Sequence, residues 1–332
     1  MRVDENLPSV TVLIAARPGQ GDIKAAAASR SLDYPREKLQ ILIARGRQPS
    51  AQRNAGMKAA RGEVVYFLDD DSVPRPGNLR IIARLLRDPA AKMAGGPNVC
   101  PPQAPPMEQV FALVLGSVLA FGPSRARYTP VGEVRATSEK ELILCNLAAK
   151  RSALLELGGF NEALYPNEEN ALMDELQKRG GKLMYDPQLL VERQPRPNLS
   201  SFARMVRTYG RGRAEQFRLH PTLGSALNFV PPLFVLYVFS TLIFLFASPR
   251  LGQWMLWPFA LYGLVVIAQV PALAANAPLS RCFAALPLIV LTHLLYGWGF
   301  WRGLFTRLNV SPDRSPVTVA IEEIDPAGSN VS

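Results

Sequence analysis

The sequence predicts an α/β domain followed by a group of apolar helices. Between residues 10 and 68, short apolar runs of strand length alternate with helical segments, a pattern typical of a parallel sheet with right-handed crossovers. The last of these runs ends in three aspartates. From residue 229 to residue 305, charged residues nearly disappear. With 332 residues, the chain is long enough for one large or two ordinary domains.

The first part of the chain has the clearest strand and helix patterns. Its opening β-branched run ends at Arg17-Pro18-Gly19, and the alanine-rich helix that follows has Asp22 as its expected N-cap. Residues 65–68 are apolar without alternation, which favours a strand buried on both faces. The predicted strands are residues 10–15, 39–44 and 65–68, and the predicted helices are residues 22–32, 51–60 and 78–86.

Three carboxylates, Asp69, Asp70 and Asp71, directly follow the strand at residues 65–68. In open α/β sheets the ligand crevice lies outside the carboxyl ends of the strands. These carboxylates are therefore well placed to hold a divalent cation and, through it, a diphosphate. A solvated acidic turn is the alternative interpretation.

The next part of the chain is less regular. A proline-rich break at residues 101–106 precedes the almost uncharged residues 107–121, which are too short to span a membrane. They fit either the protein core or the membrane interface beside a lipid substrate. The remaining predicted strands are residues 92–95, 142–149, 182–185 and 189–191, and the helices are residues 151–157, 169–179 and, amphipathic, 200–209.

Three apolar stretches near the C-terminus have the length of membrane spans. Residues 229–247, 254–274 and 283–305 each approach the ~20 residues that a helix needs to cross a bilayer. A buried helical bundle is the alternative. Membrane spans are favoured because aromatic residues cluster near the segment ends, as in an aromatic belt. These residues are Trp254, Trp257, Tyr262, Tyr296, Trp298 and Trp301.

Charge and cysteine content restrict the partners and the compartment. The formal net charge is +10, and basic residues crowd into residues 193–218, immediately before the first apolar stretch, where an anionic cytoplasmic leaflet would attract them. We expect no nucleic-acid partner, because no nucleic-acid module accompanies the charge. Cys100, Cys145 and Cys282 form no metal-ligand spacing and suit a reducing compartment. No signal-peptide pattern opens the chain, so we expect the N-terminal part in the cytosol.

Four stretches resemble one family, in the same order. They read VLIAAR (residues 12–17), PSAQRNAGMKAARGEVVYFLDDDSVP (49–74), NLAAKRSALLELGGFNEALYPNEENAL (146–172) and YGRGRA (209–214). The sequence resembles membrane-attached family 2 glycosyltransferases of the GT-A fold, especially the branch that makes bacterial exopolysaccharides. The resemblance covers most of residues 9–218, and the two long stretches are specific in combination.

The resemblance implies a GT-A domain with a Rossmann-like mixed sheet at residues 1–198, in an inner-membrane protein whose catalytic domain is cytoplasmic. The expected division continues with a basic amphipathic juxtamembrane region at residues 199–227. The membrane helices follow at residues 228–306, and a polar tail at residues 307–332 completes the chain.

The resemblance also implies a donor site. Asp69 and Asp71 would act as an Asp-x-Asp motif that holds Mn²⁺ or Mg²⁺ and the diphosphate of a nucleotide sugar, while Asp70 would point into the sheet edge or share the metal. Such a cation neutralises the leaving diphosphate as the glycosidic bond breaks. The other implied donor contacts are Ala15 and Arg17, on the base and ribose, and Arg53 and Asn54, which otherwise read as ordinary helix surface.

Glu168 and Glu169 fall where the family carries its acidic catalytic pair, at the start of a helix. By alignment Glu169 takes the place of the general base, which removes a proton from the acceptor hydroxyl. Direct attack opposite the leaving diphosphate would invert the configuration. Alternatively, the two glutamates only complement the helix dipole.

Two departures from the family leave the ligands open. Many relatives have an aspartate after the second strand that contacts uracil, but this chain has Ala44-Arg45-Gly46, so either a UDP-sugar or a GDP-sugar remains possible. The Gln-x-x-Arg-Trp motif of processive synthases is absent. In its place, Tyr209, Arg211 and Arg213 would contact the diphosphate of the donor or of a lipid carrier, or anchor the chain to the leaflet.

These features imply an inverting, single-addition transferase that acts in polysaccharide or glycolipid biosynthesis. It would move a sugar from a nucleotide donor to a lipid-linked or otherwise membrane-associated acceptor hydroxyl. In one alternative the acceptor is a polyprenyl monophosphate, which is already ionised and needs no base. In another, the chain is a non-catalytic membrane scaffold with a degenerate transferase domain.

Overall fold

The computed structural model describes residues 6–162, 168–219, 221, 223–306 and 318–326. The chain divides into two compact units. Unit 1 comprises residues 1–101, 123–194 and 310–332, and unit 2 comprises residues 102–122 and 195–309. The division differs from the predicted one in two segments, because residues 102–122 belong with the apolar helices and the C-terminal tail belongs with the sheet.

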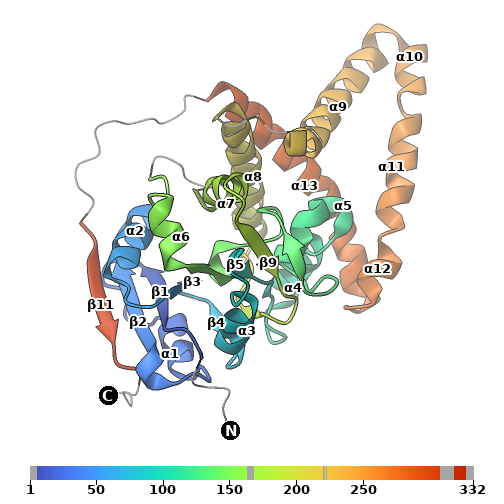
Figure 1. The fold of residues 1–332 in the computed structure, drawn as a ribbon. Helices are drawn as coiled ribbons and strands as arrows, with labels where there is room; N and C mark the ends of the chain where they lie inside the picture. Colours follow the sequence, from blue (N-terminus) through green and yellow to red (C-terminus); the bar gives the residue numbers. More distant parts are fainter. Residues whose placement is uncertain (1–5, 163–167, 220, 222, 307–317, 327–332) are drawn as a thin grey trace. The chain divides into compact units, whose positions relative to one another are not determined.

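Unit 1 is built on an eight-stranded mixed sheet with the strand order β11-β2-β1-β3-β8-β5-β9-β7 (Figure 1). The predicted parallel core is confirmed: β1 (Val10–Ala16) lies between β2 (Leu39–Arg45) and β3 (Val64–Asp69) and pairs in parallel with both. The sheet is mixed because β8 pairs antiparallel with β3 and β5. The other strands are β5 (Ala91–Gly95), β7 (Arg135–Thr137), β8 (Leu147–Lys150), β9 (Lys182–Tyr185) and β11 (Ala320–Ile324).

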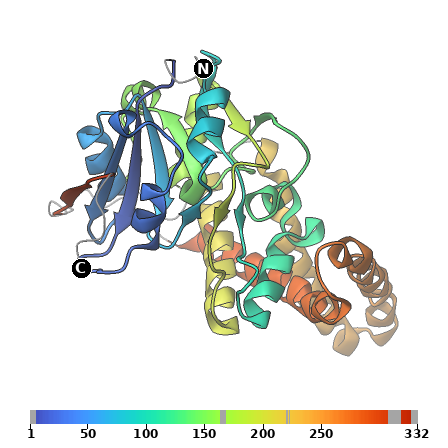
Figure 2. The ribbon, with the colours of Figure 1, turned by 90° about the horizontal axis from the view of Figure 1, so that it is seen from below.

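Helices cover both faces of this sheet, which explains why its central strands are apolar without alternation. Val12 and Ile14 pack in the same buried cluster as residues of α1 (Lys24–Arg30) and α3 (Asn78–Leu85). Leu13 points to the opposite face. There it joins residues of α2 (Pro49–Ala59), α6 (Arg151–Glu156) and α7 (Glu168–Lys178) (Figure 2).

A second, three-stranded sheet has the order β4-β10-β6. β10 (Val191–Glu192) pairs antiparallel with β4 (Val73–Pro74) and parallel with β6 (Asn98–Val99). β4 begins two residues after Asp71, and Arg193 directly follows β10. The small sheet therefore brings Arg193 beside the aspartates.

Several predicted elements need correction. Helix α1 begins at Lys24, with Ile23 rather than Asp22 at its N-cap and no side-chain cap. Residues 142–149 are not one strand, because a 3₁₀ turn at Leu144–Asn146 precedes β8. The helix predicted at residues 200–209 is α8 (Leu199–Leu219), since Gly210 and Gly212 do not end it. Both glycines are buried there, which compensates for their weak helix propensity.

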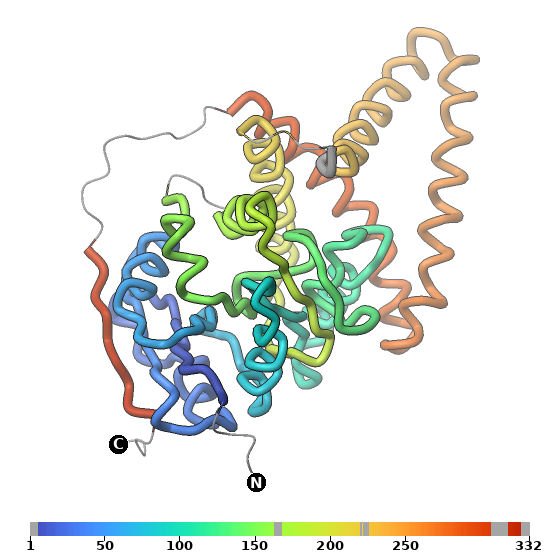
Figure 3. Tube along the Cα trace, in the orientation of Figure 1, coloured from blue at the N-terminus to red at the C-terminus, as the bar shows by residue number. Residues whose placement is uncertain are grey.

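The polar tail contributes β11, which was not predicted. This strand pairs antiparallel with β2 along its whole length, as the red segment in Figure 3 shows. Its sequence, AIEEI, has two adjacent glutamates and therefore lacks the apolar alternation by which half-buried strands are recognised.

Unit 2 is helical. Its long helices are α8, α9 (Val230–Ala247), α11 (Trp257–Ile267) and α13 (Leu279–Phe305). The shorter ones are α4 (Pro106–Leu115), α5 (Val118–Phe121), α10 (Pro249–Trp254) and α12 (Val270–Ala274). In Figure 1, α9 and α11 run antiparallel, with α10 at the turn between them.

Three segments of unit 2 are long and apolar enough to cross a membrane: Ala226–Ala247, Pro249–Ala274 and Leu279–Phe305. Only 17%, 11% and 33% of their most apolar windows are buried within the chain. Most of the side chains in these windows are therefore not covered within the described residues, as a buried bundle would require. The exposed apolar surface instead suits a lipid environment.

Candidate active site

The carboxyl ends of β1, β2 and β3 meet at one edge of the large sheet. Ala15 is in register with Ala44 on one side and with Asp69 on the other. Gln52, on α2, donates from Nε2 to the carbonyl oxygens of Ala16 (2.7 Å) and Ala44 (2.6 Å). Because Gln52 is itself buried, these bonds fix the ends of β1 and β2 against the helix.

Asp69 and Asp71 converge on one guanidinium, that of Arg193. Arg193 Nη1 lies 3.1 Å from Asp69 Oδ2, and Arg193 Nε donates to Asp71 Oδ1 at 2.7 Å. Asp69 ends β3, and Asp71 lies two residues beyond it. β10 brings Arg193, which lies 122 positions after Asp71 in the sequence, to both carboxylates. The two carboxylates thus share a single cationic partner.

A second arginine continues the arrangement. Arg53, on α2, donates to Asp69 Oδ1 (3.0 Å) and to Glu168 Oε1 (3.2 Å). Arg53 and Glu168 are both buried, at 7% and 3% exposure. We call the series Asp71, Arg193, Asp69, Arg53 and Glu168 the acid–arginine chain. It links the Asp-x-Asp segment to the start of α7.

A buried hydrogen-bond network fixes the segment that precedes Arg193. Tyr66 donates from its hydroxyl to Asn146 Oδ1 at 2.7 Å. Asn146 Nδ2 donates to the Leu189 carbonyl (2.6 Å), and Asn78 Nδ2 donates to the Leu190 carbonyl (2.8 Å). Burial raises the pKa of Tyr66 far above its usual value, so the phenol stays neutral and remains a donor. The network holds the chain that enters β10.

The acid–arginine chain is electrostatically coupled. Burial raises the pKa of Asp71, an effect that Arg193 partly offsets and Asp69 reinforces. Burial by itself would lower the pKa of Arg193, but Asp69 and Asp71 hold it well above its usual value. Arg193 is therefore permanently charged and acts as the internal counter-ion of both aspartates.

The donor set fits a divalent cation that is also bound by a ligand. Among the described residues, no group of three or more His, Cys, Asp or Glu side chains is arranged to hold a metal alone. Two aspartate carboxylates do converge, because both contact the same guanidinium. Mg²⁺ and similar hard cations are commonly held by one or two carboxylates together with substrate phosphates.

The other predicted donor residues lie at the same edge, with different contacts. Asp70 accepts a hydrogen bond from Gln20 Nε2 at 2.6 Å. The Arg17 side chain is exposed just after β1. Asn54 uses its amide internally: Nδ2 donates to the Phe160 carbonyl (2.9 Å), and Oδ1 accepts from the Phe160 backbone N–H (2.8 Å). Asn54 thus fixes the turn at residue 160.

Glu168 and Glu169 start α7 as predicted, but their environments differ. Glu168 is buried and paired with Arg53, whereas Glu169 is half-buried. Within the described part of the chain, the Glu169 side chain has no hydrogen bond or ion pair. Residues 163–167, which precede this pair, lie outside the described residues.

The three residues predicted to contact phosphate lie on α8, in unit 2, where Arg211 and Arg213 have different partners. Arg211 Nε is 3.4 Å from Glu215, and Arg213 donates to Gln216 Oε1 at 3.0 Å. Tyr209 is half-buried on the same helix.

Sequence reasoning did not single out Arg193 or Gln52. Arg193 was included only in the general basic content of residues 193–218. Its position immediately after a predicted closing strand is the signal that could have marked it, since side chains at strand ends face the ligand crevice.

This chain is similar to known proteins in sequence and in fold. The profile of the family Glycosyl transferase family 2 matches residues 33–151. The pre-mycofactocin glycosyltransferases of two Mycobacterium tuberculosis strains are each 28% identical over 174 residues, which cover 52% of this chain and 36% of theirs. The chain thus spans about a third of the length of these curated relatives.

Among solved structures, the chain resembles the mannosyltransferase PcManGT from Pyrobaculum calidifontis, solved in complex with GDP-Man and Mn²⁺. The TM-score is 0.51 at 18% identity, over 89% of this chain and 88% of the other. At this identity the likeness shows the fold. The chain therefore has the GT-A fold, and residues 33–151 carry a glycosyltransferase family 2 domain.

Proposed function

We propose that this chain is an inverting, non-processive glycosyltransferase that takes a sugar from a nucleotide donor and adds it to an acceptor carried by a membrane lipid. The observation that carries the proposal is the convergence of Asp69 and Asp71 on one cationic point, at the carboxyl edge of the parallel strands. The family match over residues 33–151 supports the reaction class.

Asp69 and Asp71 are the proposed ligands of Mn²⁺ or Mg²⁺. When bound, the cation would supply positive charge to the leaving diphosphate. Arg53 holds Asp69 from the side opposite Arg193 and so orients its carboxylate. Ala15, near the end of β1, and Arg17, just after it, are the proposed contacts of the base and ribose. A GDP-sugar deserves the first test because the P. calidifontis enzyme was solved with GDP-Man, and a UDP-sugar the second.

Glu169 is the proposed general base. It would accept the proton of the acceptor hydroxyl while that oxygen bonds to the anomeric carbon and the nucleoside diphosphate leaves from the opposite face, which inverts the configuration. Glu168 is less suited to this role, because it is buried and its carboxylate is already paired with Arg53. Glu168 instead positions Arg53, and through it Asp69.

The acceptor is proposed to be lipid-linked because three segments of the chain can cross a membrane. We place the protein in the bacterial inner membrane with unit 1 in the cytoplasm, where nucleotide sugars are made. The basic helix α8 would then lie at the anionic cytoplasmic leaflet.

Asp71→Asn tests the proposal. It removes one charged ligand, so Mn²⁺-dependent binding and hydrolysis of GDP- and UDP-sugars should both be lost. The measurements are calorimetric titration and nucleoside-diphosphate release. Asp33→Asn is the matched control, since Asp33 is an exposed aspartate of unit 1 paired with Arg80 at 2.8 Å. Normal donor turnover by Asp71→Asn would refute the metal site, and absence of donor hydrolysis by the unmodified protein would favour a non-catalytic scaffold.

A further inference from the structure

Unit 2 contains a basic pocket between α8 and α13. Its volume is about 140 Å³, roughly ten times the 10–15 Å³ that one water needs. We call it the basic pocket. Its charged and aromatic lining residues are Arg204, Arg207, Arg211, Trp298 and Arg302, and Thr208 and Gly299 complete it.

Two features of the sequence create this pocket. Arg204, Arg207 and Arg211 are spaced by three and four residues, so they share one face of α8. Glycines let α13 approach that helix closely: a Cβ atom at Gly299 would lie 2.1 Å from the Arg207 carbonyl oxygen, and one at Gly303 would lie 2.5 Å from that of Arg211. Arg302, between these glycines, therefore joins the arginines of α8.

The charge of the pocket is only slightly compensated. Arg211 lies 3.4 Å from Glu215. No carboxylate in the described part of the chain is within ion-pair distance of Arg204, Arg207 or Arg302. Four guanidiniums therefore face a single carboxylate, and guanidinium groups bind phosphate oxygens with two parallel hydrogen bonds each. A phosphate carrying two or more negative charges matches this pocket better than a singly charged one.

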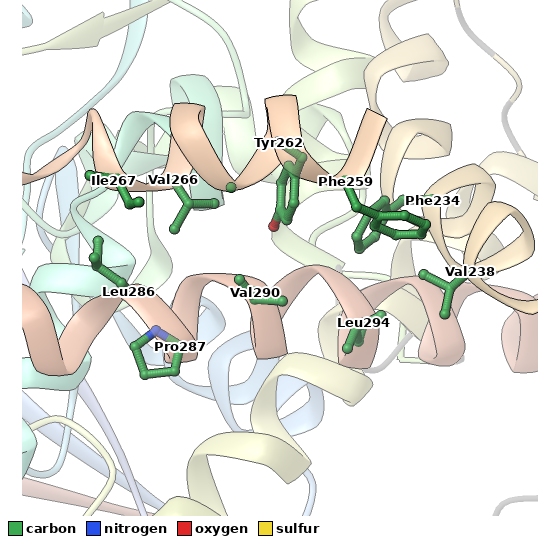
Figure 4. Close-up of a pocket in the computed structure, with 11 residues that line it drawn as sticks. Phe234, Val238, Phe259, Tyr262, Val266, Ile267, Leu286, Pro287, Val290 and Leu294 are labelled. Atoms are coloured by element: carbon green, nitrogen blue, oxygen red, sulfur yellow. The ribbon is translucent and has the colours of Figure 1, made fainter. Parts of the chain in front are cut away.

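A second pocket of unit 2 is apolar and has a volume of about 490 Å³. Figure 4 shows Tyr262 and Val266 of α11 on one side and Val290 and Leu294 of α13 on the other. The only polar side-chain group among its lining residues, the Tyr262 hydroxyl, already bonds to His293 Nδ1 at 2.7 Å. The side chains of this apolar pocket therefore leave no unsatisfied polar group for a polar ligand, and the pocket suits a hydrocarbon chain.

One row of side chains on α13 contributes to both pockets and turns by about 160° round the helix between Leu286 and Arg302. Residues at every fourth position of a helix form a continuous ridge. Leu286, Val290 and Leu294 line the apolar pocket, and Trp298 and Arg302, the next two members of the same row, line the basic pocket. The row extends over roughly 24 Å at 1.5 Å per residue.

We propose that unit 2 binds a long-chain lipid with a terminal phosphate or diphosphate. The head group lies in the basic pocket and the chain follows α13 into the apolar pocket. The role of this lipid as the carrier of the sugar acceptor rests on the proposed function, whereas the binding itself does not. Phosphodiester lipids, with one charge on an internal phosphate, should bind less well.

The test measures displacement of a fluorescent polyisoprenyl phosphate from the full chain in phosphatidylcholine nanodiscs. The competitors are polyisoprenyl phosphate, phosphatidic acid, phosphatidylglycerol and polyisoprenol. We expect both terminal-phosphate lipids to compete at least about tenfold better than the other two. A preference for polyisoprenyl phosphate identifies the bound hydrocarbon chain as isoprenoid, and a preference for phosphatidic acid identifies it as acyl. Equal competition by phosphatidylglycerol would overturn the proposal, since simple leaflet attraction would then suffice.

Variants locate the site. Arg207→Gln combined with Arg302→Gln should weaken binding by about tenfold or more, and the corresponding lysine pair should weaken it less, because lysine keeps the charge but loses the bidentate geometry. Arg250→Gln, at an exposed arginine of α10 outside the pocket, should not change it. An equal loss in Arg250→Gln would overturn the assignment.

The apolar pocket has its own variant. Val290→Trp, which fills that pocket, should weaken the binding of polyisoprenyl phosphate but leave the binding of inorganic pyrophosphate unchanged. A variant that no longer folds is recognised by the loss of its helical circular-dichroism signal. Lipid binding without glycosyl transfer would refute the proposed function alone, and transfer without selective lipid binding would refute this inference alone.

Discussion

At the scale of single residues, the candidate site depends on alternating charges. Arg193 neutralises Asp69 and Asp71 in the absence of a ligand, at the point where both carboxylates converge. Two neighbouring carboxylates with no counter-ion would repel each other and raise one pKa. Arg193 therefore stabilises the ligand-free site, and it competes with any cation that uses the same oxygens.

Replacing Arg193 tests this competition. Arg193→Gln should lower the metal-free stability by about 1–3 kcal/mol, because it removes the cationic partner of the partly buried Asp71 and one of the two arginines that contact Asp69. Mn²⁺ should then raise the melting temperature of the variant more than that of the unmodified protein. Thermal unfolding with and without Mn²⁺ measures both effects. Arg80→Gln, which breaks the exposed pair with Asp33, is the control. Equal Mn²⁺ shifts in Arg193→Gln and the unmodified protein would show that the guanidinium does not compete.

The two glutamates of α7 should have separable roles. Glu169→Gln should lower turnover by roughly 10²–10⁴ with donor affinity little changed, the effect of losing a general base. Glu168→Gln breaks the pair with Arg53 and should mainly weaken metal and donor binding, since Arg53 also holds Asp69. Steady-state kinetics and donor titration separate these effects. Reversed magnitudes would transfer the role of base to Glu168, and full activity of Glu169→Gln would favour a polyprenyl phosphate acceptor, which needs no base.

At the scale of elements, β11 is attached to the sheet by charged side chains as well as by its ladder. Glu323 accepts hydrogen bonds from Arg61 Nη1 (2.9 Å) and Gln40 Nε2 (3.3 Å), and Glu322 pairs with Arg45 at 2.8 Å. The hydrogen bond from Arg61 lowers the pKa of Glu323 below its ordinary value of 4.5. The attachment of β11 is therefore pH-dependent.

The direction of that dependence follows from linkage. A carboxyl whose pKa is lowered by folding stabilises the folded state above its ordinary pKa, and the effect is lost as the pH falls through the lowered value. Hydrogen exchange of the amides of β11, corrected for intrinsic rates, should thus accelerate below about pH 4.5. Glu323→Gln should exchange faster at neutral pH and lose this dependence. Glu175→Gln, at an exposed pair on α7, is the control. Unchanged protection of β11 in Glu323→Gln would contradict the prediction.

At the scale of the whole molecule, strand pairing restricts the membrane topology. β11 follows the three candidate spans and pairs with β2, which precedes them. If these segments enter a membrane, the chain must cross it an even number of times between the two strands, so the three segments cannot all be full crossings. Such a return agrees with the arginines at residues 302, 307 and 314, which follow the last apolar segment and favour the cytosolic side.

The same reasoning applies to α4 and the apolar segment after it. Pro106–Leu115 and Val118–Arg127 are together apolar enough for one span but are bent by 58°. β5 precedes this pair and β8 follows it, yet the two strands are neighbours in one sheet. A single crossing is therefore impossible, and the pair would enter and leave the membrane on the same side.

Cysteine labelling in a background without the three native cysteines tests the topology. Cysteines replacing Glu37 in unit 1 and Asp325 after β11 should be labelled from the same side of the membrane. A cysteine replacing Gln253, in the turn between α9 and α11, should be labelled from the other side. Labelling of positions 37 and 325 from opposite sides would show that β11 does not pair with β2 in the membrane-bound protein.

The local sequence pattern determined the central strands, the position of the aspartates and the apolar segments of this protein. The runs that form β1, β2 and β3 are continuous and apolar because helices cover both faces of the sheet, and that requirement is visible in the sequence. The aspartates at the end of β3 and the three apolar segments could be identified in the same way, because strand ends and membrane spans are recognised over a few to about twenty residues.

Only the tertiary structure decided how distant segments meet. Arg193 lies 122 positions from Asp71, Glu323 lies 262 positions from Arg61, and the arginines of the basic pocket come from two helices that glycines bring together. The partners of such charged side chains cannot be identified from a sequence period, because they are set by strand pairing and helix packing rather than by neighbours in the chain. The counter-ion of the aspartates, the return of the C-terminal strand and the basic pocket therefore required the folded chain.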